Sequence, residues 1–160
     1  MKKTFVSTII ALLLLIVLAS ATFAAPAAEE RQLLLKGSFE ATETHEFAPG
    51  VMFVDATGVG NATQLGLFTY DLQAQVSLPS LAATASAALI AANGDMIFGE
   101  GVGQGTPTGD PNVVSIVETY AITGATGRFS GATGNFTVER LIDRATGFST
   151  GTISGNIVIP

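Results

Sequence analysis

The chain has 160 residues, of which 48% are hydrophobic and only 12% are charged, with 18 Gly and neither Cys nor Trp. This is not the composition of a disordered chain, which needs low hydrophobicity and high net charge. The lack of Cys excludes disulfides, thiol nucleophiles and cysteine-ligated metals. Because the chain has a single His and no cofactor motif, we expect no metal and no cofactor.

The first 24 residues have the pattern of a secretory signal peptide. Two lysines precede an apolar run over residues 5–19, and small residues follow it. A basic start, a short apolar core and an A-x-A-like exit are typical of such leaders. The core is shorter than the roughly 20 residues of a membrane span. We therefore predict cleavage after Ala21 or Ala24 rather than an uncleaved anchor, and a secreted or periplasmic protein without membrane attachment.

The 136 residues after the leader carry all 13 acidic residues against five basic ones, a net charge of −8. This length fits one domain, which we place at residues 33–160 after a flexible arm over 25–32. A strongly negative surface repels nucleic acids and anionic membranes, so neither is an expected partner.

Beyond residue 32, apolar residues recur mostly at every second position, and Gly, Thr and Asn interrupt them at short intervals. This pattern is typical of the short strands of a sandwich or barrel. Asn93-Gly94 is a strong hairpin signal, residues 103–112 form a predicted loop, and the Ala-rich residues 81–88 could form a helical turn. We predict eight strands, over residues 33–47, 51–58, 65–78, 85–92, 96–102, 113–123, 135–142 and 148–159.

Antiparallel strands joined by short turns leave exposed edges unless the sheet closes. We therefore predict an all-β fold, an eight-stranded antiparallel β-barrel, with an open two-sheet sandwich as the alternative. A barrel of eight strands is either filled by its own side chains or holds one small ligand.

The segment from Glu118 to Phe136, ETYAITGATGRFSGATGNF, runs from a strand through a Gly-rich turn into a second strand. It resembles a signature of plant allene oxide cyclases and dirigent proteins, and still more that of small exported bacterial proteins with the same barrel. Such bacterial chains also carry a segment like GNATQLGLF at residues 60–68. The resemblance implies a calycin-like barrel related in shape to lipocalins. It leaves self-association open, since the plant relatives form dimers or trimers, and it transfers no functional residue.

The glycines around Phe129 occur in two Gly-Ala-Thr-Gly repeats. A Gly-rich loop can bind phosphate when a helix begins behind it. Here a strand follows instead, so we expect a compact turn whose glycines supply positive φ. Phe129 is then placed to close one end of the barrel.

Three predicted strands each carry one charge in the middle of their bulkiest apolar face. Side chains alternate with period two along a strand, so Glu100, Glu118 and Arg140 converge if these faces line the interior. A connection centred on Phe129 places Glu118 opposite Arg140, whereas a slip of one residue would separate them. The faces also contain Met96, Phe98 and Val102, then Ile116 and Tyr120, then Phe136 and Val138.

Two carboxylates around one guanidinium carry a net charge of −1, so one Glu could retain a proton and act as a general acid. Glu100, Glu118 and Arg140 are therefore our candidate catalytic residues. A purely structural ion pair and an outward-facing set of charges are the alternatives.

Candidate ligand-binding residues are Tyr70 and Tyr120, whose hydroxyls need partners when buried, together with Phe98 and Gln64. Gln64 is either a mouth residue or a turn residue. Near the end of the first strand, Glu40, Glu43, His45 and Glu46 form an acidic patch. It lacks the spacing of a calcium loop, so we interpret it as solvated surface.

Three functions fit these patterns. The first is a barrel that binds a small apolar molecule in its interior or at its mouth, which we favour. The second is a cyclase or isomerase that uses the Glu/Arg cluster, which leaves the enzymatic status open. The third is an extracellular structural or interaction domain with a filled core. Only the first two require a cavity, of a few hundred cubic ångströms by the usual scale of ligand pockets.

Overall fold

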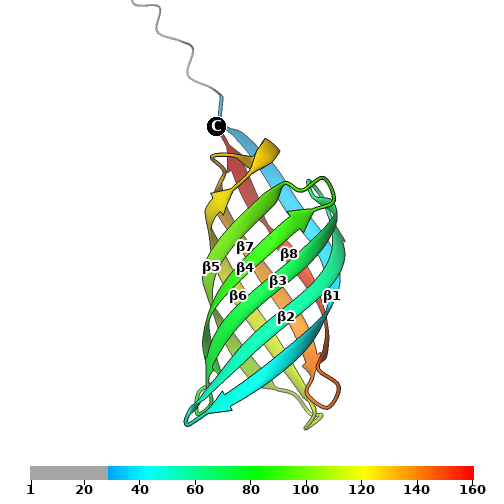
Figure 1. Cartoon of the computed structure of the whole chain (residues 1–160), viewed down its shortest axis with the longest axis vertical. Helices are drawn as coiled ribbons and strands as arrows, with labels where there is room; N and C mark the ends of the chain where they lie inside the picture. Colours follow the sequence, from blue (N-terminus) through cyan, green and yellow to red (C-terminus); the bar gives the residue numbers. More distant parts are fainter. Residues whose placement is uncertain (1–28) are drawn as a thin grey trace, which may run out of the picture.

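The computed structural model describes residues 29–160, which form eight strands and one short 3-10 helix (Figure 1). The predicted signal peptide and most of the predicted arm lie outside these residues. The described part contains no helix long and apolar enough to cross a lipid bilayer. The elements are β1 (Arg31–Ala48), β2 (Val51–Ala62), β3 (Gly66–Ser77), β4 (Ala82–Ala91), β5 (Met96–Pro107), β6 (Val113–Ala125), η1 (Gly127–Phe129), β7 (Thr133–Asp143) and β8 (Phe148–Ile159).

Each strand pairs antiparallel with the next, and β8 pairs back onto β1, so the sheet forms a closed barrel. The closing seam contains twelve residue pairs, from Arg31 with Ile159 to Thr42 with Phe148. Within residues 29–160, closure gives every strand a paired neighbour on both sides. The predicted all-β, eight-stranded antiparallel barrel is confirmed, and the two-sheet sandwich was the wrong alternative.

Several strands are longer than the sequence pattern predicted. β5 continues to Pro107 through the predicted loop, because Gly103 and its neighbours pair in register with β6. The Ala-rich stretch is a strand from Ala82 onward, so it forms no helical turn. β1 already begins at Arg31, inside the predicted arm, because β8 is long enough to pair with it.

Large aromatic rings fill the middle of the barrel, and glycines on neighbouring strands make room for them. The rings of Phe39 and Tyr70 lie 4.7 Å apart, and those of Tyr120 and Phe136 are stacked at 4.8 Å. A Cβ atom at Gly99 would lie 2.9 Å from the Phe136 ring. Glycine-rich strand faces therefore point inward in this barrel, because a larger side chain there would collide with the core.

One end of the barrel is closed by the segment around η1, the upper end in Figure 1. Phe129 is 1% exposed and belongs to the hydrophobic core, together with Leu65 of the β2–β3 turn. Gly127 has φ +58°, in the left-handed region that favours glycine. The Gly-rich motif is thus a compact turn that carries a plug residue, as predicted.

Candidate functional site

The opposite end of the barrel opens into a cavity of about 600 Å³. Its mouth lies among the β1–β2, β3–β4, β5–β6 and β7–β8 connections, where it is lined by Phe47 near the end of β1 and by Leu78, Pro111 and Arg144 of the other three connections. Apolar side chains form most of the wall, namely Met52, Val54, Val76, Val114, Ile116 and Ile142. Only the floor carries buried charges.

The floor consists of Arg140 held between two carboxylates. Arg140 Nε donates to Glu118 Oε2 at 3.2 Å, and its Nη2 donates to Glu118 Oε1 at 3.0 Å. Arg140 Nη1 donates to Glu43 Oε1 from the other side. All three side chains are buried, with Glu43, the most exposed, at 7%. Such charge-assisted, partly bidentate bonding fixes the guanidinium rigidly.

The strand register brings these residues together from β1, β6 and β7. Glu118 lies opposite Val138, and Arg140 lies opposite Ile116, so the pair is offset by two residues from the predicted direct opposition. An even offset keeps both side chains on the same face. Glu118 and Arg140 therefore meet diagonally inside the barrel, within reach of long side chains.

Glu43 was missed as a floor residue, because it lies in a polar run that we interpreted as solvated surface. That interpretation is wrong for Glu43, since it is buried against Arg140. The alternation of side chains along the strand could have revealed it, because Glu43 lies on the same face of β1 as Leu35 and Phe39, both of which are core residues. Glu40 and Glu46, on the other face, are exposed as predicted.

Electrostatics keep Arg140 ionised. Burial by itself would lower the pKa of Arg140, but the adjacent Glu118 and Glu43 carboxylates outweigh burial and raise this pKa above its ordinary value. His45 extends the cluster towards the mouth, with its Nε2 atom 3.4 Å from Glu43 Oε2. Two carboxylates and one guanidinium leave the buried floor with one negative charge in excess.

Tyr70 and Tyr120 lie inside the barrel, as predicted, but they do not line the cavity. Burial raises the pKa of both hydroxyls above the ordinary value of 10.0, and the negative charge of Glu118 raises it further. Within residues 29–160, neither hydroxyl nor Ser149 Oγ makes a hydrogen bond of regular geometry, although the two tyrosine hydroxyls lie close enough to influence each other's pKa. The two tyrosines therefore belong to the core and not to the cavity wall.

Three other predicted site residues lie elsewhere. Glu100 and Phe98 are on the outer face of β5 and exposed, because the inward positions of this strand are Ile97 and a run of glycines. Placing them in the interior was wrong. Gln64 is an exposed turn residue between β2 and β3, at the closed end, so the alternative that placed it at the mouth is also wrong.

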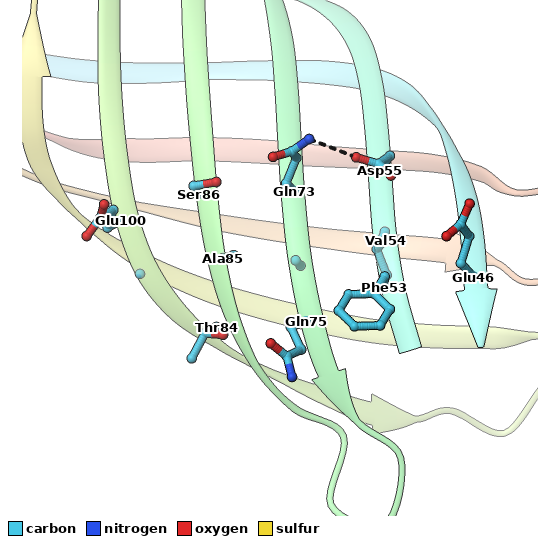
Figure 2. Close-up of a pocket in the computed structure, with 12 residues that line it drawn as sticks. Glu46, Phe53, Val54, Asp55, Gln73, Gln75, Thr84, Ala85, Ser86 and Glu100 are labelled. Carbon is cyan, nitrogen blue, oxygen red and sulfur yellow. Dashed lines mark hydrogen bonds between the residues drawn. The ribbon is translucent and has the colours of Figure 1, made fainter. Parts of the chain in front are cut away.

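A second hollow, of about 690 Å³, lies on the outer surface of β2 to β5 (Figure 2). Its central row contains Asp55, Gln73, Ser86 and Glu100, which are in register on successive strands. Gln73 Nε2 donates to Asp55 Oδ1 at 3.1 Å, and all four side chains are exposed. Exposed polar groups are already solvated, so the inner cavity, with its buried charges, is the stronger candidate site.

No family model and no curated protein matches this sequence. Among solved structures, a pterocarpan synthase dirigent protein matches with a TM-score of 0.60, over 87% of this chain and 99% of that chain, at 15% sequence identity. Fold similarity at this identity does not transfer function. The narrower resemblance to allene oxide cyclases and small exported bacterial proteins stays a prediction. The described chain has the dirigent-like fold, a closed barrel of eight antiparallel strands.

Proposed function

We propose that this protein is exported and binds one small apolar molecule in the open-ended cavity. The observation that carries the proposal is a cavity of about 600 Å³ in a barrel whose other end is packed. Small-molecule pockets are typically about 300–1,000 Å³, mostly apolar and furnished with a few polar groups. The cavity has these three properties, whereas a domain with a filled core would need none of them.

The walls and the floor suggest how such a ligand would sit. The apolar body would contact Val54, Val76 and Ile116, which line the wall, and its polar end would reach the charged floor. Because the plugged end offers no passage, the ligand would enter through the mouth with its polar end first. Tyr70 and Tyr120 do not line the cavity, so we propose no direct contact between them and the ligand.

Nile red, an uncharged dye that brightens in apolar surroundings, tests the proposal directly. We expect the wild-type protein to bind one dye molecule with an increase and blue shift of its emission. Ala83→Phe should abolish this response, because Ala83 lines the cavity and a phenyl group there occupies the ligand's space. Ala82→Phe is the matched control, since the neighbouring alanine is exposed on the outer face of the same strand.

Equal dye binding by the two variants would contradict the proposal, because it would place the dye outside the barrel. Thermal melts of both variants should accompany the titration, so that loss of binding is compared only between folded proteins.

Export is tested separately from ligand binding. N-terminal sequencing of the protein recovered outside the cytoplasm should begin at residue 22 or residue 25. A mature protein that keeps residues 1–21 would contradict the proposed cleavage.

A cyclase or isomerase activity is the second candidate, and the composition of the floor favours it. Glu43 and Glu118 share one guanidinium at the bottom of the cavity, and glutamate side chains commonly donate or accept protons in catalysis. For any substrate found to turn over, Glu118→Gln should abolish turnover and leave Nile red affinity within about threefold, a change of about 0.7 kcal/mol. Undiminished turnover would exclude Glu118 from the chemistry.

A further inference from the structure

The charge of the cavity floor restricts which polar group a ligand can bring to it. Five titratable residues line the cavity: Glu43, His45, Glu118, Arg140 and Arg144. Arg144 is exposed at the rim, where solvent screens it, and His45 is partly exposed. The buried part therefore consists of two carboxylates and one guanidinium, with one negative charge left unbalanced.

The hydrogen-bonding capacity of the floor points in the same direction. A guanidinium has five N–H donors, and three of those of Arg140 are used on the two carboxylates. The four carboxylate oxygens can accept about eight hydrogen bonds. The floor therefore has more free acceptors than free donors, and it suits a ligand group that donates.

Glu43 is the more available of the two carboxylates. Glu118 accepts two bonds from Arg140 in a bidentate arrangement, whereas Glu43 accepts one bond from Arg140 and has its second oxygen 3.4 Å from His45 Nε2. The second oxygen of Glu43 faces His45, which lies on the side of the mouth. A donor group that enters the cavity can thus reach Glu43 Oε2 by replacing or joining His45, without displacing Arg140.

We propose that the cavity selects lipophilic amines, in which a protonated amino group is attached to a compact apolar body. This inference rests on the proposed ligand-binding function and specifies its ligand class. An ammonium group brings one positive charge and only hydrogen-bond donors. It therefore neutralises the excess negative charge of the floor and occupies its free acceptors. A carboxylate or phosphate brings only acceptors and further negative charge, and burying it here would leave three or more anionic groups around one guanidinium.

Three naphthalene derivatives of nearly equal size test the inference at pH 7.5: 1-naphthylmethylamine as the cation, 1-naphthalenemethanol as the neutral form and 1-naphthoate as the anion. The protein has no Trp, so naphthalene fluorescence can be followed with little background. We expect the amine to bind about tenfold more tightly than the alcohol, because it gains one partly desolvated ion pair with the floor. We expect it to bind about a hundredfold more tightly than the acid, because the negative charge of the acid is repelled by the floor.

Glu43→Gln removes the excess charge and keeps the shape of the side chain. In this variant the preference for amine over alcohol should fall to about twofold or less, because a neutral floor attracts an ammonium only weakly. Glu100→Gln is the matched control, since it removes one carboxylate from the exposed outer face and should keep the preference of the wild type. The wild-type ranking remains decisive if Glu43→Gln fails to fold.

Equal affinities for amine and alcohol, tightest binding of the acid, or no binding of any naphthalene would overturn this inference. Nile red binding by the same protein sample would then still support a ligand-binding cavity. Loss of Nile red binding as well would overturn the proposed function together with the inference.

Discussion

Replacing Arg140 by Met is the sharpest test of the charged floor. The substitution keeps an unbranched side chain in the barrel but removes the cation that bonds to both Glu118 and Glu43. Two carboxylates that are at most 7% exposed then lack a counter-charge. Breaking a buried ion pair in this way costs about 3–5 kcal/mol. In a domain of this size we expect Tm to fall by about 10–20 °C.

Urea unfolding at pH 7, followed by far-UV circular dichroism, measures this loss as a change in the free energy of unfolding. Arg144→Met is the control, because this exposed arginine at the rim should cost less than about 1 kcal/mol. Adding Glu43→Gln and Glu118→Gln to Arg140→Met should recover at least half of the loss, since no buried charge remains. An Arg140→Met variant within about 1 kcal/mol of the wild type would refute the reasoning, because it would mean that water reaches the cluster freely.

Two further predictions concern the core beneath the cavity. Gly103→Ala should destabilise the protein by about 1–3 kcal/mol in the same urea assay, because a Cβ atom would lie 2.8 Å from Glu118 Cγ. Gly109→Ala is the control and should be neutral, because a Cβ atom there meets open space. Equal effects of the two substitutions would contradict this packing. In a titration of absorbance at 295 nm, Tyr70 and Tyr120 should form no phenolate near pH 10 while the protein stays folded, because burial raises the pKa of both. Above pH 10 the folded state then binds more protons than the unfolded state. The free energy of unfolding is therefore unaffected by the two tyrosines below pH 10 and falls above it by about 1.4 kcal/mol per pH unit for each tyrosine. A reversible phenolate signal from the folded protein near pH 10 would contradict the buried positions.

The fold could be predicted from the sequence because local signals and global topology agree. Apolar residues with period two, a strong hairpin signal and short connections all favour antiparallel strands that pair with their neighbours. The alternation of side chains along each strand also sufficed to place Glu118 and Arg140 on one inner face, although their predicted register was off by two residues. This alternation tolerates such an error because any even slip preserves the face.

The rest of the site could not be predicted, because hydrophobicity is a poor guide to the inner face where the core is crowded. On β5 the bulky residues, Phe98 and Val102, point outward, and glycines point inward to make room for Tyr120 and Phe136. Glu100 lies between Phe98 and Val102 on the same face of the strand, so it is exposed on the outside as well. Conversely, Glu43 is buried within a polar run. Its burial could not be predicted, because Arg140, the partner that makes it possible, is 97 residues away in the sequence.

The seam between β1 and β8 has a consequence for how the chain acquires its structure. The first strand of the barrel finds its second neighbour only in the last twelve residues before Pro160. Until that C-terminal segment emerges from the ribosome, β1 presents an unsatisfied row of amides and carbonyls, and the cylinder stays a curved, open ribbon. Contacts between the two ends of a chain form slowly, because a long loop must first be closed. The nascent polypeptide therefore cannot close the barrel before β8 has been synthesised.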